Sequence, residues 1–117
     1  MIGIGIDITP IERISGMREK YGDKFLEKLL AQGEQGGNAE TLAGLWAAKE
    51  AVAKALGSGY NGFGPTDICI SRDALGAPSV DLRGKAAEIA LSRGITTVKL
   101  SISHAAGLAV ACAVTLE

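Results

Sequence analysis

Apolar and small residues alternate from the start of the chain. Isoleucine occupies every second position from 2 to 8, with Gly3, Gly5 and Asp7 among the residues between. Because side chains alternate between the two faces of a strand, residues 2–9 predict a strand with an isoleucine face toward the core. The opposite face is nearly bare backbone, so another element, a neighbouring subunit or a ligand can approach it closely.

A helical spacing of apolar residues follows this strand. Asn38 can cap the longest of the predicted helices, and Gly57 can end it. Its small residues, Ala43, Ala47 and Ala51, indicate a helix side suited to close approach rather than to solvent. The spacing predicts helices over residues 10–21, 23–32, 39–56 and 84–93.

Alternation returns in the second half of the chain. It predicts strands over residues 67–71, 78–82, 97–103 and 108–114, with a turn at 104–107. In the last strand the large apolar residues face one way and Ala109, Ala111 and Ala113 face the other. We expect both of its faces to be buried, with the alanine face forming a subunit contact.

This order of elements predicts an α+β fold, a mostly antiparallel sheet packed with helices, in one domain spanning residues 1–117.

Composition narrows the class of protein. The chain is 47% hydrophobic but 4% aromatic, so its core must consist of Ile, Leu, Val and Ala. A net charge of −1 argues against a general nucleic-acid binder. Cys69 and Cys112 lie in apolar runs and read as buried free thiols. With no secretory signal and no membrane span, we expect a cytoplasmic protein.

Three features suggest a catalytic or binding site, and each also has a purely structural explanation. Asp7 lies on the bare strand face, or it merely caps the turn that follows. Glu50 and Lys54 share a helix face, or they form a surface salt bridge worth roughly 0.3–0.5 kcal/mol. His104 ends an alternating strand, where it is a site residue or simply bonds a turn carbonyl.

Four stretches of the chain carry a family resemblance: GIGIDITPIERI, FLEKLLAQGE, LAGLWAAKEAVAKALGSG and SISHAAGLAVACAV. In this order they resemble holo-acyl-carrier-protein synthases, the small 4′-phosphopantetheinyl transferases, essentially from end to end. The resemblance implies Mg²⁺-dependent transfer of 4′-phosphopantetheine from coenzyme A to a serine of apo acyl carrier protein, with release of adenosine 3′,5′-bisphosphate. It also implies a homotrimer with active sites at subunit interfaces.

The resemblance assigns roles to particular residues. Asp7 and Glu50 match the magnesium ligands, and Lys54 matches the lysine that contacts the attacked phosphate. Lys54, Gly57 and His104 are the expected coenzyme A contacts. A metal-bound water or a carboxylate of the Asp7–Glu50 pair would accept the proton of the carrier serine.

Carrier docking is expected at Arg13, Lys24 and Lys28, unless these pair with the neighbouring acidic residues. Two other interpretations stay open: a non-catalytic homologue that binds coenzyme A or carrier protein, and a purely structural oligomer.

The chain departs from the family pattern at several positions. Leu45 replaces an arginine, Ala77 replaces the lysine of a Gly-Lys-Pro turn, and Ala105 follows the histidine where a polar residue is common. We expect Leu45 to be at least partly buried and the site to lack one cationic contact.

Overall fold

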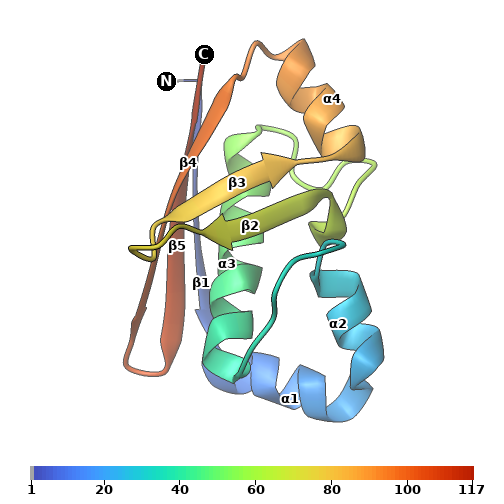
Figure 1. The fold of residues 1–117 in the computed structure, drawn as a ribbon, viewed down its shortest axis with the longest axis vertical. Coiled ribbons are helices and arrows are strands. Elements are labelled where there is room, and N and C mark those ends of the chain that lie inside the picture. Colours follow the sequence, from blue (N-terminus) through green and yellow to red (C-terminus); the bar gives the residue numbers. More distant parts are fainter. Residues whose placement is uncertain (1) are drawn as a thin grey trace.

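The computed structural model describes residues 2–117 (Figure 1). The elements follow the predicted order, with a short 3₁₀ helix, η1, added before the second strand. They are β1 (Gly3–Pro10), α1 (Ile11–Tyr21), α2 (Asp23–Leu29), α3 (Ala39–Ala55), η1 (Pro65–Asp67), β2 (Ile68–Arg72), β3 (Pro78–Leu82), α4 (Gly84–Ser92), β4 (Thr97–Ala105) and β5 (Leu108–Leu116). The α+β class is confirmed, and every strand pair is antiparallel.

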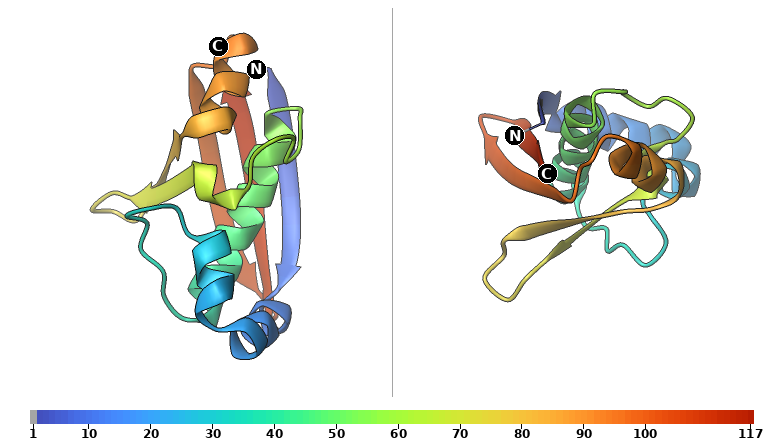
Figure 2. Two further views of the ribbon diagram at one scale, coloured as in Figure 1. Left: turned by 90° about the vertical axis from the view of Figure 1, so that its right-hand side faces the viewer. Right: turned by 90° about the horizontal axis from the view of Figure 1, so that it is seen from above.

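The strands form two sheets rather than one. A three-stranded sheet has the order β1-β5-β4, and β2 pairs with β3 in a separate two-stranded ribbon. Helix α3 lies along one face of the larger sheet, while none of the other elements in residues 2–117 covers its opposite face (Figure 2). The core therefore lies between this sheet, α3 and the remaining helices.

The bare face of β1 packs against the backbone of α3. A Cβ atom on Gly3 would lie 2.1 Å from the Ala55 carbonyl oxygen, and one on Gly5 would lie 2.0 Å from that of Ala51. Such distances exclude any side chain, so these glycines set how closely the helix approaches the sheet. Of the three occupants considered for this face, another element of the chain is the one found.

Two predictions about the sheet are wrong. The isoleucine face of β1 lies outside the core, where Ile4, Ile6 and Ile8 are 61%, 58% and 59% exposed. The alanine face of β5 is buried under α3 within the same chain, so it is not available for a subunit contact. Small side chains let a helix backbone approach, and this close packing leaves the larger side chains on the uncovered face.

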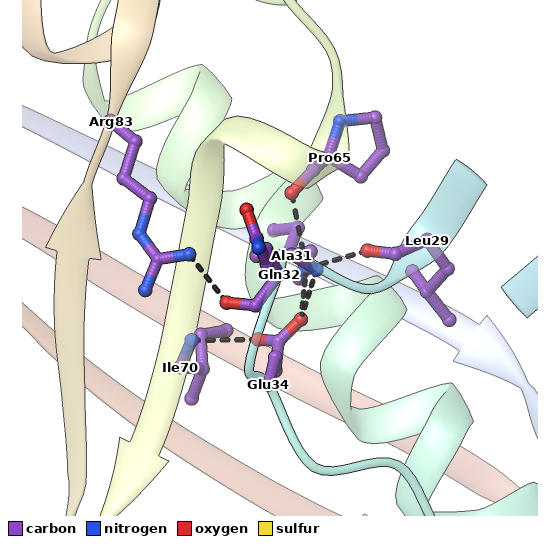
Figure 3. Close-up of polar contacts among 8 residues, drawn as sticks. Leu29, Ala31, Gln32, Glu34, Pro65, Ile70 and Arg83 are labelled. Carbon is purple, nitrogen blue, oxygen red and sulfur yellow. Dashed lines mark hydrogen bonds and ion pairs between the residues drawn. The ribbon is translucent and has the colours of Figure 1, made fainter. Parts of the chain in front are cut away.

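A buried ion pair connects α3 to the middle of the chain (Figure 3). Lys49 of α3 is fully buried, and its Nζ donates to Glu34 Oε1 at 2.5 Å, to the Leu29 carbonyl at 2.6 Å and to the Pro65 carbonyl at 3.0 Å. Glu34 Oε2 accepts the backbone N–H of Ile70 in β2 at 2.6 Å. Removing one partner of such a pair typically costs about 3–5 kcal/mol, because the other charge stays buried.

This pair also explains why α2 is shorter than predicted. The helix ends at Leu29 rather than at residue 32, and Leu30 has an extended backbone. The Leu29 carbonyl is oriented toward Lys49, and the Ala31 N–H donates to Glu34 at 3.0 Å. A polar contact with the distant Lys49 and a local one with Glu34 thus replace the last turn of the expected helix.

The hairpin that joins β4 to β5 is tighter than predicted. Ala106 and Gly107 both have positive φ, 54° and 77°, as in the two-residue turns that match the twist of antiparallel strands. The expected four-residue turn is therefore wrong, and His104 is a strand residue paired with Ala109.

Both cysteines are free, as expected, but Cys112 is only half-buried on the outer face of the sheet. Within residues 2–117, none of the helices combines the length and the apolar character that crossing a bilayer requires.

Candidate active site

Asp7 lies where β1 passes under α3. Its side chain is 18% exposed, and Oδ2 accepts a hydrogen bond from the Thr9 hydroxyl at 2.7 Å. Helix α1 begins after Pro10 without a side-chain cap. Among residues 2–117, no backbone N–H donates to this carboxylate, so Asp7 does not cap the turn that follows, and its other oxygen faces Lys54 of α3.

Lys54 reaches from α3 to this carboxylate. Its Nζ lies 3.5 Å from Asp7 Oδ1 and donates to the Ile6 carbonyl at 2.8 Å. Among residues 2–117, no salt bridge joins Lys54 to Glu50, so the plain i,i+4 surface pair is not what the structure contains. The lysine instead links the helix to β1.

Glu50 is half-buried one turn before Lys54. Burial raises the pKa of Glu50, the charge of Asp7 raises it further, and the charges of Lys54 and Arg13 lower it. The two carboxylates therefore lie within each other's electrostatic field. Among residues 2–117, none donates a hydrogen bond to the Glu50 side chain.

The donor set suits a hard divalent metal ion. Residues 2–117 contain no cluster of three or more His, Cys, Asp or Glu side chains that could hold a metal alone. Two neighbouring carboxylates are nevertheless what Mg²⁺ commonly takes from a protein when substrate phosphates and waters complete its coordination. Asp7 and Glu50 fit that pattern.

Tyr60 was missed by the sequence reasoning. It lies in the glycine-rich loop after α3, and its pKa is raised by burial, by the charge of Glu50 and by that of Asp7. An aromatic residue in a predicted loop gave no signal of this placement. Lys49 was also missed, although a lysine among the alanines before Glu50 was a signal that it is buried.

His104 does not join this group. Its Nε2 lies 3.0 Å from the Glu40 carbonyl oxygen in the first turn of α3, and its Nδ1 lies 3.9 Å from Glu40 Oε1. A Cβ on Gly44 would lie 2.9 Å from Nε2, so this glycine admits the ring. Strand β5 separates β4 from β1, which places His104 and Asp7 on opposite flanks of α3, roughly 10 Å apart across the sheet.

A pocket of about 660 Å³ opens on the His104 flank. Leu45, Cys69, Arg72 and His104 are among its lining residues. Leu45 is 7% exposed, which confirms that it is buried. The missing cationic contact stays a prediction, and titration of Leu45→Arg with coenzyme A checks it: unchanged affinity and melting temperature would contradict it.

Gly57 ends α3 as predicted. Its φ is +84°, and its N–H donates to the Lys54 carbonyl at 3.0 Å. A Cβ there would lie 2.5 Å from Nη1 of Arg93, the end of an exposed and flexible side chain that can move aside, so the positive φ is what favours glycine at this position.

The expected docking residues lie on the outside of α1 and α2. Lys24 and Lys28 are exposed, and the Arg13 guanidinium lies 5.8 Å from the ring centroid of Trp46. Among residues 2–117, no ion pair joins these three to the acidic residues beside them. The charge of Arg13 lowers the pKa of Glu50, so Arg13 is the one of these three residues whose charge acts on a carboxylate of the site.

Comparison with known proteins identifies the family of this chain. The family model of the 4′-phosphopantetheinyl transferase superfamily matches residues 3–113. The chain belongs to this superfamily. The match includes β1 and α3, and therefore all four of the residues Asp7, Glu50, Lys54 and His104.

Individual superfamily members are similar over nearly the whole chain. A holo-acyl-carrier-protein synthase of Aliarcobacter butzleri is 48% identical over 114 residues, which cover 95% of this chain and 94% of that protein. The crystal structure of the synthase from Neisseria meningitidis has a TM-score of 0.90 at 36% identity and covers 100% of both chains. The Helicobacter pylori synthase in complex with coenzyme A has a TM-score of 0.83 at 35% identity, covering 97% of this chain and 99% of that one.

Proposed function

We propose that this protein is an enzyme that transfers 4′-phosphopantetheine from coenzyme A to a serine of apo acyl carrier protein. Its superfamily and the names of its relatives support this activity, as does the coenzyme A bound to a related structure. The observation that carries the proposal is the grouping of Asp7, Glu50 and Lys54 where β1 meets α3.

The reaction replaces the phosphoanhydride bond of coenzyme A by a phosphodiester bond between phosphopantetheine and the carrier serine. The carrier serine oxygen bonds to the phosphorus next to pantetheine, and the bond from that phosphorus to the bridging oxygen breaks. Adenosine 3′,5′-bisphosphate leaves with the bridging oxygen, and the serine proton passes to a water or to a carboxylate of the pair.

Each of the three residues has a task in this reaction. Asp7 and Glu50 would hold Mg²⁺, which neutralises negative charge on the diphosphate when it is bound. Lys54 would steady the charge that develops on the attacked phosphate. Its contacts with Asp7 and Ile6 hold the ammonium group beside β1 before substrate arrives.

We propose that the complete site is shared between chains of a homotrimer. His104 and its pocket lie on the flank of α3 opposite to Asp7, so one chain offers two separate half-sites. The outer face of the β1-β5-β4 sheet offers an apolar contact surface through Ile4, Ile6 and Ile8. A neighbour packed on that face would let coenzyme A span Asp7 of one chain and His104 of another.

Arg13, Lys24 and Lys28 are the proposed docking surface for the carrier protein. Acyl carrier proteins are acidic, so a local group of unpaired cations would attract them despite the net charge of −1. We also propose the cytoplasm as the site of action, which two free thiols favour and cell fractionation would check.

One assay separates transfer from mere binding. The protein is incubated with coenzyme A, Mg²⁺ and an apo acyl carrier protein, and the intact mass of the carrier is measured. We expect a gain of one phosphopantetheine group on the carrier serine and matching release of adenosine 3′,5′-bisphosphate. Coenzyme A binding without any mass gain would instead favour a non-catalytic homologue.

A further inference from the structure

The loop after α3 holds a buried polar group that has no partner. Tyr60 packs against the core, and its ring meets that of Phe63 edge-on with the centroids 5.4 Å apart. Among the buried side-chain nitrogen and oxygen atoms of residues 2–117, its hydroxyl is the one without a hydrogen bond. Burying a hydroxyl in this way is unfavourable, and such a group in a native protein calls for an explanation, such as a catalytic role or a bound water or ion.

The candidate active site contains the matching acceptor. Glu50 is half-buried and accepts no hydrogen bond from residues 2–117. Asp7 is already engaged, because Thr9 donates to one carboxylate oxygen and Lys54 lies 3.5 Å from the other. Of the two carboxylates whose charges act on Tyr60, Glu50 is therefore the one with free lone pairs.

We propose that Tyr60 is a positioning residue whose hydroxyl donates a hydrogen bond to the Glu50 carboxylate when that carboxylate holds the divalent cation. The inference rests on the proposed function. Groups that donate to the outer oxygen of a metal ligand fix its orientation, and losing one typically weakens metal binding by about 10–100-fold.

The surroundings of Tyr60 suit such a donor. Burial and the two nearby carboxylates raise its pKa, so the hydroxyl keeps its proton at neutral pH. The ring of Tyr60 packs against that of Phe63. The chain turns from α3 into this loop through Gly57 and Gly59, whose φ values are +84° and +60°. The loop follows α3 directly and the charge of Glu50 acts on Tyr60, so the movement that the proposed hydrogen bond requires is a rotation of the Glu50 side chain when it holds the cation.

The test compares Tyr60→Phe with wild type in Mn²⁺ binding, followed by electron paramagnetic resonance in the presence of saturating coenzyme A. We expect about tenfold weaker Mn²⁺ binding in Tyr60→Phe. The melting temperature without metal should stay equal or rise, because phenylalanine keeps the ring and removes the unpaired hydroxyl. Tyr21→Phe is the matched control, since Tyr21 is 51% exposed on α1 and should leave both quantities unchanged.

The outcomes distinguish this inference from the proposed function. Equal Mn²⁺ affinity in Tyr60→Phe and wild type would overturn the role of Tyr60 and leave the metal site standing. Weaker binding accompanied by a lower melting temperature would indicate general loosening and would also overturn it. A wild-type protein that binds no Mn²⁺ would remove the metal site itself, and this inference with it.

Discussion

The ammonium group of Lys54 lies 3.5 Å from the carboxylate of Asp7, although 47 positions separate the two residues in the sequence (54 − 7 = 47). The contact crosses from α3 to β1 at the point where Gly5 lets the helix approach the strand. The close packing of Gly5 against the helix backbone thus brings the Lys54 ammonium group to the candidate site. The proposed role of Lys54 follows from this contact.

Replacing Lys54 should impair the chemical step more than substrate binding. We expect Lys54→Ala to lower kcat by roughly 10²–10³, the usual effect of removing a group that stabilises transition-state charge. The fold should persist because the side chain is 53% exposed. Steady-state kinetics measure this, with Lys85→Ala at the exposed start of α4 as control. A higher KM for coenzyme A with unchanged kcat would instead assign Lys54 to binding alone.

The ionised Glu50 side chain should destabilise the metal-free protein at neutral pH. Burial, and then the charge of Asp7, raises the pKa of Glu50 above its ordinary value of 4.5. Between pH 4.5 and the raised pKa of the folded state, Glu50 has lost its proton in the unfolded chain but keeps it in the folded chain. Raising the pH through this range therefore favours unfolding. Glu50→Gln should therefore melt at a higher temperature than wild type at neutral pH with chelator present. Screening at this half-exposed side chain keeps the gain small.

Melting curves at several pH values check this expectation. The difference should vanish below the ordinary carboxyl pKa, where wild type is protonated in both states, and should shrink when Mg²⁺ is added. Glu88→Gln, an exposed change on α4, is the control. A Glu50→Gln variant that melts at a lower temperature than wild type at neutral pH would contradict the claim that burial and the charge of Asp7 destabilise ionised Glu50.

The exposed isoleucines of β1 should mediate assembly. We expect light scattering to give the mass of three chains for wild type, and of one chain for Ile6→Glu, because the change buries a charge in the proposed contact. The same variant should lose transfer activity if the site is shared. Leu91→Glu is the control, since Leu91 is 82% exposed on α4. A wild type that stays monomeric at micromolar concentration would refute the trimer.

Arg13 should contribute to carrier binding through its charge. We expect Arg13→Ala to raise the KM for carrier about fivefold, the effect of ~1 kcal/mol, and added salt to weaken wild-type binding further. Lys20→Ala removes an equal charge from the same helix and should have little effect. If carrier affinity in Arg13→Ala matched wild type at low and high salt alike, docking would have to occur elsewhere.

The order of the helices and strands could be predicted from the sequence. Which face of β1 is buried could not. Both faces of residues 2–9 lacked charge except at Asp7, so large side chains were expected inside. The decisive factor was the alanine-rich side of α3, which packs closely against the small residues Gly3 and Gly5 and the alanines of β5. That complementarity joins segments far apart in the chain, and no local pattern reports it.

The candidate site could be predicted only in part for the same reason. Residue patterns marked Asp7 and the Glu50–Lys54 spacing, yet the resemblance alone linked them. The Lys49–Glu34 pair spans 15 positions (49 − 34 = 15) and is invisible to helix periodicity, which assigned Lys49 no partner. The separation of His104 from Asp7 depends on the strand order β1-β5-β4, which the sequence does not encode locally.

The role of the Asp7–Glu50 pair is tested by comparing wild type with Glu50→Gln in the carrier mass assay. Both receive coenzyme A, Mg²⁺ and apo acyl carrier protein, with Glu88→Gln alongside and circular dichroism to verify folding. We expect complete conversion of the carrier by wild type and Glu88→Gln, and no conversion by folded Glu50→Gln. Conversion at equal rates by wild type and Glu50→Gln would contradict the claim that the Asp7–Glu50 pair carries out the transfer.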